Sequence, residues 1–194
     1  MIIVVRHGRT ESNASGLLLG RNDPPLDETG RRQAAAAANV LSGVGRVVSS
    51  PLLRTRQTAE AIAEAACVDV EVEERFIELD YGEWDGRPVA DVPSHEWAAW
   101  RADLEFAPPG GESLAALGRR VRAALDDLAQ DAISEDIAVV THVSPVKAAV
   151  AWALGVGDET SWRMFVTPAS ITRIAVGEGM RSLTSFGDVA HLRD

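Results

Sequence analysis

The sequence predicts an α/β fold, a three-layer sandwich in which a mostly parallel central sheet is flanked by helices. Two observations carry this prediction. Short apolar runs of strand length recur along the chain, and alanine-rich or amphipathic segments of helical length separate them. Continuous apolar runs are typical of strands covered on both faces, and strands that alternate with helices usually pair in parallel. We expect the 194 residues to form a single domain, because this length suits one hydrophobic core.

Five segments are expected to form strands. Residues 2–5, 46–49 and 137–140 each have an uninterrupted apolar centre, as buried parallel strands do. Residues 170–176 and 181–186 follow late in the chain and predict two strands or a hairpin. Gly177 and Gly179 lie between them, where a turn is needed.

Four segments are expected to form helices. Residues 28–42 are rich in alanine and follow Asp27, a suitable N-cap. Ser50-Pro51 and Ser144-Pro145 each resemble a cap followed by proline at the first helical position, which predicts helices to about residues 66 and 154. Within 112–131, leucine and valine recur every three or four residues, as on an amphipathic helix.

Residues 76–111 interrupt this alternation. The stretch is rich in glycine, proline and tryptophan, which argues against one long regular element. We interpret it as an insertion with short helices near the functional site, because long connections in compact domains often cover a site. A surface excursion around a small aromatic cluster fits the composition equally well.

The charge and cysteine content exclude several classes of function. There are 19 lysine and arginine residues against 29 acidic ones, for a net charge of −10, so we expect no nucleic-acid partner and no anionic membrane partner. No apolar stretch approaches the roughly 18–20 residues that span a bilayer, and no signal peptide is expected. Cys67 is the only cysteine, so an internal disulfide and a multi-cysteine zinc site are excluded. A cytoplasmic location follows as the expectation.

Two histidines and two arginines are predicted to meet at one edge of the sheet. His7 directly follows the strand 2–5, with Arg6 beside it, and His142 follows the strand 137–140. Arg54 lies early in the helix after the strand 46–49. The carboxyl ends of parallel strands share one edge, where ligands bind.

This set of residues suits phosphoryl transfer. Guanidinium groups bind phosphate oxygens in a fork and stay charged at any working pH. A neutral imidazole attacks phosphorus and holds the phosphoryl group covalently. A second imidazole, cationic when the ligand is bound, stabilises charge on the phosphoryl oxygens. A helix opening after His142 would direct backbone N–H groups at the same anion. A carboxylic acid is still needed to protonate the leaving oxygen and then to activate water.

Four ordered motifs resemble the histidine phosphatase superfamily, in its phosphoglycerate mutase-like branch 1. The opening motif is Arg6-His7-Gly8, followed by Asn13, Gly20 and Pro25-Leu26; the others are SSPLLRTRQTA at 49–59, FIELDYGEWDG at 76–86 and VVTH at 139–142. Many relatives have glycines after the second histidine, whereas VSPVK at 143–147 resembles phosphatase-type members, including an acid phosphatase domain that is fused to ribonuclease H. The chain as a whole resembles the α-ribazole phosphatase and acid phosphatase members. The resemblance implies a phosphoglycerate mutase-like fold over the whole chain.

The resemblance also implies roles. His7 would be the nucleophile and Glu78 the general acid and base. The implied catalytic residues are Arg6, His7, Arg54, Glu78 and His142, and the implied phosphate-binding residues are Arg6, Asn13, Gly20, Arg54, His142 and Val143. Asp80, Glu83 and Asp85 compete with Glu78 for the acid role. No metal and no organic cofactor is expected.

The predicted function is hydrolysis of a small phosphate ester through a phosphohistidine on His7. The alternatives are a phosphoglycerate mutase, which returns the phosphoryl group to a second hydroxyl, and a non-catalytic module that binds phospholigands. A metal hydrolase built on the histidines is weaker, because two fixed cations would repel a metal ion. The arginines of the helix 112–131, namely Arg119, Arg120 and Arg122, are expected to form a solvated face. The sequence leaves open whether the chain forms a homodimer.

Overall fold

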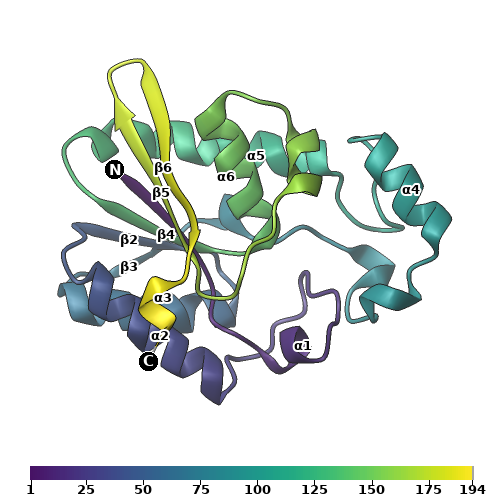
Figure 1. The fold of residues 1–194 in the computed structure, drawn as a ribbon, viewed down its shortest axis with the longest axis horizontal. Coiled ribbons are helices and arrows are strands. Elements are labelled where there is room, and N and C mark those ends of the chain that lie inside the picture. The colour runs from purple at the N-terminus through teal and green to yellow at the C-terminus, as the bar shows by residue number, and fades with distance from the viewer. Residues whose placement is uncertain (194) are drawn as a thin grey trace.

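The central sheet has six strands, in the order β3-β2-β4-β1-β5-β6 (Figure 1). The fold is described here from a computed structural model that covers residues 1–193. The strands are β1 (Ile2–Arg6), β2 (Arg46–Ser49), β3 (Val70–Val72), β4 (Ile137–Thr141), β5 (Ile171–Gly177) and β6 (Met180–Asp188). β1 to β4 run parallel, whereas β5 and β6 form an antiparallel hairpin on the β1 side. The mostly parallel α/β sandwich is therefore confirmed.

Two pairs of helices cover the two faces of this sheet (Figure 1). The helices are α1 (Glu11–Ala14), α2 (Glu28–Leu41), α3 (Leu53–Ala66), α4 (Ser94–Ala102), α5 (Leu114–Ala129) and α6 (Val143–Leu154). α2 and α3 pack on one face, and α5 and α6 pack on the other. Within residues 1–193, no helix is long and apolar enough to cross a membrane.

Alternate residues of each buried strand enter different core clusters, which explains the continuous apolar runs. In β1, Ile2 and Val4 face α5 and α6, whereas Ile3 and Val5 face α2 and α3. All five residues of β1 are buried. A side chain on either face of a central strand thus meets a helix, so every position of the strand is apolar.

The parallel strands end at a common edge, and this edge positions the site. β1 and β4 are in register with Arg6 opposite Thr141, so the next residues, His7 and His142, leave the sheet together. Ser49, the last residue of β2, lies opposite Val140. The strand ends therefore converge as the sequence predicted.

Residues 76–111 form short helices away from the sheet. Two 3-10 turns, Gly82–Trp84 and Val89–Asp91, precede α4, which lies at the far end of the molecule from β6 (Figure 1). One isolated bridge joins Leu17 to Pro88, so this segment lies against the chain that follows α1.

Both predicted serine-proline caps are wrong. α3 begins at Leu53 after Leu52, because the hydroxyl of Ser50 is hydrogen-bonded to His142 instead of a helix amide. α6 begins at Val143 with His142 in the N-cap position, so Ser144 is already helical. The cap at Asp27 is confirmed, since its carboxylate accepts the Gly30 N–H. The short edge strand β3 was not predicted, because two of its three residues are exposed and give no buried apolar run.

Candidate active site

His7 is buried with its two ring nitrogens in different roles. Nδ1 lies 2.6 Å from the carbonyl oxygen of Gly8, and a carbonyl oxygen can only accept a hydrogen bond. The proton therefore lies on Nδ1. Nε2 lies 3.3 Å from Nε of Arg54, which can only donate. Both partners select the tautomer whose Nε2 carries a free electron pair.

Gly8 has a steric reason to be glycine. A Cβ at this position would collide with the carbonyl oxygen of Gly30 in α2. The amide of Gly8 also donates to the hydroxyl of Thr58 in α3. The backbone after His7 is thus clamped between α2 and α3, which holds the imidazole in place.

The second histidine stands beside the first. The rings of His7 and His142 have centroids 5.2 Å apart and are inclined at 63°. Nε2 of His142 lies 2.7 Å from the hydroxyl oxygen of Ser50, while its buried Nδ1 has no partner among the described residues. Burial lowers the pKa of both histidines well below the ordinary value, and the cationic Arg54 lowers them further. Both imidazoles are therefore neutral at neutral pH.

Arg54 is completely buried, and backbone carbonyls fix its guanidinium. Nη1 donates to the oxygen of Asn22 over 2.7 Å, and Nη2 donates to the oxygen of Gly20 over 2.8 Å. Because these carbonyls are neutral, the positive charge is held in place without being cancelled by a carboxylate. Burial lowers the pKa of Arg54, but no protein arginine loses its proton at neutral pH.

The loop that holds Arg54 is itself held by Asp85. One carboxylate oxygen of Asp85 accepts the Gly20 N–H over 2.9 Å. The other accepts the N–H groups of Arg21 and Asn22, each over 2.8 Å. The acid that follows Trp84 thus organises the loop around the arginine and does not face the histidines in a catalytic role.

Arg6 supplies a second cation. Its Nη1 donates to the oxygen of Val166 over 2.6 Å, whereas its buried Nε has no partner among the described residues. Burial lowers the pKa of Arg6 to about 10, which leaves it charged at neutral pH. Arg6 Nε and His142 Nδ1 are thus two buried nitrogens of one site with unused hydrogen-bonding capacity, which suits an anion with several oxygens.

Glu78 lies at the amino end of α6. Its Oε2 accepts the Val143 N–H over 3.0 Å, and its Oε1 accepts the Ser144 N–H over 3.2 Å. Oε1 also accepts the N–H of Leu79 over 2.7 Å. The amides that the sequence assigned to a phosphate are therefore held by a carboxylate in this structure, and the carboxylate is only 3% exposed.

Arg120 positions the chain around Glu78. Its guanidinium donates to the backbone oxygens of Arg75, Ile77 and Glu78, over 2.6, 2.7 and 3.2 Å. It also makes a two-pronged ion pair with Glu112. The predicted solvated face is thus wrong for Arg120. It is also wrong for Arg122, which pairs with the buried Asp158. Arg119 alone of the three is largely exposed.

The remaining predicted residues are Asn13 and two of the acids that compete with Glu78. The Oδ1 atom of Asn13 accepts the backbone N–H of Thr10 over 3.1 Å in a capping box of α1, so its NH2 group is the end left for a ligand. Among the competing acids, Glu83 is exposed, and Asp80 accepts the N–H of Gly82 within its own turn.

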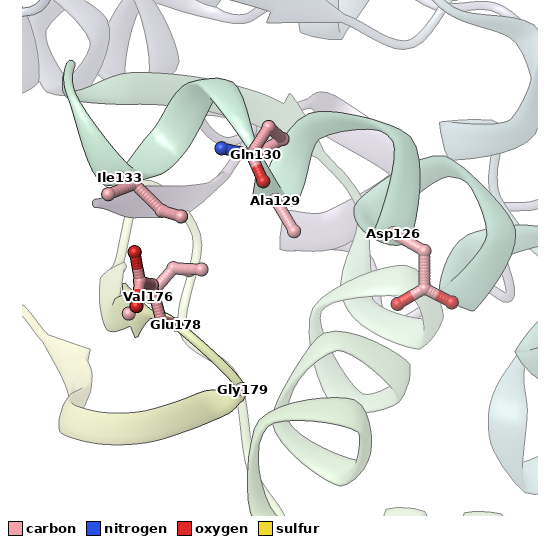
Figure 2. Close-up of a pocket in the computed structure, with 8 residues that line it drawn as sticks. Asp126, Ala129, Gln130, Ile133, Val176, Glu178 and Gly179 are labelled. Carbon is pink, nitrogen blue, oxygen red and sulfur yellow. The ribbon is translucent and has the colours of Figure 1, made fainter.

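The pocket shown in Figure 2 contains none of these residues. It has a volume of about 440 Å³ and lies between the end of α5 and the β5–β6 turn, lined by Asp126 and Glu178 among others (Figure 2). β5 is antiparallel to β1, so this turn lies at the sheet edge opposite to His7. Its acidic lining is unsuited to a phosphate ester. Among residues 1–193, no group of three or more histidine, cysteine or acidic residues is arranged to hold a metal ion.

The comparison with protein families agrees with this geometry. The model of the histidine phosphatase superfamily (branch 1) matches residues 2–189. The chain belongs to this superfamily. The branch 1 assignment covers every residue discussed above, from Arg6 to Val166.

Curated relatives of this chain differ in length and in name. A bifunctional protein of Mycobacterium tuberculosis is 36% identical over 177 residues, which are 88% of this chain and 49% of the relative. The chain thus spans about half the length of that relative. Phosphoserine phosphatase 1 of Hydrogenobacter thermophilus is 34% identical, with 98% of this chain and 93% of the relative covered. A probable phosphoglycerate mutase of Yersinia enterocolitica is 33% identical, with 98% and 94% covered.

Solved structures of histidine phosphatases share the whole fold. A variant of the phosphoserine phosphatase of Entamoeba histolytica, crystallised with phosphoserine, superposes with a TM-score of 0.90 at 26% sequence identity. The superposition covers 99% of this chain and 98% of that structure. The three-layer arrangement and its phosphoglycerate mutase-like topology are therefore those of known phosphatases.

Proposed function

We propose that this protein is a phosphomonoesterase that hydrolyses a small phosphate ester through a phosphohistidine on His7. One observation supports the proposal above all: the unprotonated Nε2 atom of the neutral His7 lies 3.3 Å from Nε of the buried, cationic Arg54. A nucleophile and an anion-binding group are thus placed for the same phosphoryl group. Names of relatives that include phosphoserine phosphatase support a small alcohol as the leaving group.

In the first step, Nε2 of His7 attacks phosphorus, a P–N bond forms and the P–O ester bond breaks. Arg6, Arg54 and His142 bind the phosphoryl oxygens, with Asn13 and the Gly20 loop beside them. The leaving oxygen takes a proton from the carboxylic acid form of Glu78, which thereby becomes the carboxylate. As phosphoryl oxygens accept the Val143 N–H, an oxygen of Glu78 is released towards the leaving group.

In the second step, Glu78 takes a proton from water. The water oxygen then attacks phosphorus, the P–N bond breaks, and inorganic phosphate leaves with His7 restored. No metal or organic cofactor enters either step. We propose in addition that residues 1–194 act as one domain in the cytoplasm, and that residues 76–111 border the site.

The mutase alternative needs the phosphoryl group to return to a second hydroxyl. In the segment 76–111, basic residues that could retain such a substrate are few, namely Arg87 and Arg101. Arg101 lies over the rings of Trp97 and Trp162, each 5.9 Å from its guanidinium carbon. Hydrolysis is therefore the outcome that the geometry favours.

The test traps the intermediate. The enzyme is quenched during turnover of a labelled phosphate ester, and acid-labile phosphohistidine is measured beside free phosphate and beside interconversion of 2- and 3-phosphoglycerate. We expect label on the wild type and none on His7→Ala, with His95→Ala, an exposed histidine, as the matched control. Label that persists in His7→Ala overturns the mechanism. Interconversion that far exceeds phosphate release establishes the mutase, and activity that EDTA abolishes and zinc restores establishes the metal hydrolase.

A further inference from the structure

Lys147 is the only lysine in the sequence. Eighteen of the 19 residues in the lysine and arginine total are arginines. The two side chains are not interchangeable, since lysine offers a compact charge and arginine a broad planar fork. The surroundings of the single lysine are therefore of interest, because its compact ammonium group differs from the guanidinium groups used elsewhere in the chain.

Lys147 lies on α6, one turn after the residues that hold Glu78. It lines a pocket of about 140 Å³, called here the aromatic pocket, together with Tyr81, Trp97, Trp100 and Trp162. Trp97 and Trp100 stack with centroids 5.3 Å apart, and Trp162 stands edge-on to Trp100 at 5.1 Å. These rings contact one another and together form one side of the aromatic pocket.

The aromatic pocket adjoins the reaction centre. Val143 and Ser144 also line it, and their N–H groups are the ones that bind the carboxylate of Glu78. Glu78 is the proposed proton donor to the leaving oxygen. The aromatic pocket and the proposed proton donor therefore share the first turn of α6, which makes this pocket the neighbour of a group attached to that oxygen.

The only charged side chain that lines this pocket, among the described residues, is the cation of Lys147. No acidic residue among residues 1–193 lines it, although the whole chain carries a net charge of −10. Within the same residues, Lys147 forms no ion pair, and the buried Nε1 atoms of Trp100 and Trp162 have no hydrogen-bond partner. An indole N–H can only donate, as can an ammonium group. The unsatisfied groups thus all require an acceptor.

The position of Lys147 is costly without a counter-charge. Burial lowers its pKa, and the neighbouring Glu78 only partly opposes this effect. An anionic ligand in the pocket would offset the cost of burying the ammonium group.

We propose that Lys147 determines specificity by binding a carboxylate on the alcohol part of the substrate. The substrate class is then a phosphate monoester of a small hydroxy acid. The inference rests on the proposed phosphatase function. The aromatic pocket has a volume of only about 140 Å³, which suits the carboxylate end of a short acid.

The first test compares two substrates that differ in the carboxylate. 3-Phosphoglycerate has a carboxylate where glycerol 3-phosphate has a hydroxymethyl group. We expect the wild type to prefer the acid at least tenfold in kcat/KM. Lys147→Met should reduce this ratio to about one, chiefly by raising KM for the acid, and Lys147→Arg should retain part of it. A ratio that Lys147→Met leaves unchanged, or a wild type that prefers glycerol 3-phosphate or a bisphosphate, overturns the inference.

The second test uses the single lysine as a probe. Reductive methylation with ¹³C-formaldehyde labels Lys147 and the amino terminus and keeps the positive charge. In His7→Ala, we expect 3-phosphoglycerate to shift the Lys147 signal and glycerol 3-phosphate to leave it in place. Equal shifts, or no shift with bound 3-phosphoglycerate, contradict the assignment. Hydrolysis of p-nitrophenyl phosphate with a trapped phosphohistidine checks the phosphatase function separately, because that ester has no carboxylate.

Discussion

Nε of Arg54 lies 3.3 Å from Nε2 of His7, and of these two nitrogens only that of the arginine carries a proton. The arginine keeps its proton and prevents the imidazole from gaining one. His7 therefore stays neutral, as the proposed nucleophile must be, at a pH where an ordinary histidine would be partly protonated. The same cation then lies where negative charge arrives with the substrate.

The fork of Arg54 is expected to matter as much as its charge. Arg54→Lys keeps the cation but cannot donate to Gly20, Asn22 and His7 together. We expect kcat/KM to fall roughly 10²–10³-fold, as for other lost charge-stabilising donors. Steady-state kinetics measure the effect. Arg56→Lys is the matched control, because Arg56 is half exposed and pairs only with Glu60 one turn away. Equal losses in the two variants would argue against a phosphate-binding role.

Glu78→Gln should affect esters according to their leaving group. An alkyl alcohol needs a proton as it departs, so we expect roughly a 10²–10⁴-fold loss of kcat, whereas an aryl phosphate should lose much less. The comparison uses glycerol 3-phosphate and p-nitrophenyl phosphate. Glu83→Gln serves as the control, because Glu83 is an exposed acid in the same motif. Equal losses on both esters would assign the acid role to another residue.

Asp85→Ala removes a positioning residue of the phosphate pocket. The N–H groups of Gly20, Arg21 and Asn22 lose their shared acceptor, and the carbonyls that hold Arg54 become free to move. We expect kcat/KM to fall roughly tenfold or more and the free energy of unfolding to fall by about 1–3 kcal/mol. Asp85→Glu should restore part of both. Asp91→Ala, which removes an exposed acid of the same segment, should change neither kcat/KM nor the free energy of unfolding. A similar loss in Asp91→Ala would contradict the positioning role of Asp85.

Arg120→Met should weaken both the fold and the placement of Glu78. It leaves Glu112 without its partner and frees the carbonyls of Arg75, Ile77 and Glu78. We expect the free energy of unfolding to fall by about 3–5 kcal/mol in urea titrations. At temperatures where the variant is folded, kcat for alkyl esters should fall while KM changes little. Arg119→Met, on the exposed side of α5, should cost under about 0.5 kcal/mol.

The buried histidines predict acid sensitivity of the fold. In the folded state the pKa values of His7 and His142 lie well below 6.5, mainly because burial disfavours their charged forms. As the pH falls through about 6.5, the unfolded chain binds protons that the folded chain does not, so the free energy of unfolding decreases. The limiting slope is about 1.4 kcal/mol per pH unit for each histidine.

Urea unfolding between pH 5 and 8 measures this slope. His142→Asn and His7→Asn should each lower the slope of the free energy of unfolding against pH by the contribution of one histidine. His95→Gln, at an exposed position, should leave the slope unchanged. Unchanged slopes in both buried variants would show that carboxylates alone set the acid sensitivity.

The architecture could be predicted from the pattern of apolar residues and from the places of polar residues at the ends of the predicted strands. Buried parallel strands leave continuous apolar runs, and the residues that follow them must meet at one edge, so the proximity of His7 and His142 follows from their places in the sequence. The position of Arg54 early in the helix after the strand 46–49 predicted it at the same edge, whereas Glu78 was identified only from the family motif. The strand β3 escaped prediction because exposed residues at a sheet edge carry no apolar signature.

The residues that hold the site were harder to predict. Ser50 has the composition of a helix cap, yet its hydroxyl binds an imidazole from a strand far away in sequence. Arg120 lies among arginines on an amphipathic helix, and its carbonyl partners belong to a segment without regular structure. Such contacts depend on how irregular segments pack, and neither periodicity nor local propensity encodes that packing.

The bonds from Asp85 to the loop at Gly20 also restrict how this protein can be re-engineered. The segment 76–111 invites exchange between relatives as a way to alter substrate choice. Yet Asp85 within it fastens the loop that holds Arg54, so a transplanted segment without a carboxylate at this position would bring a new preference together with a crippled catalyst. Chimeras should therefore carry Asp85 unchanged, and natural exchange of this segment by recombination would be filtered by the same requirement.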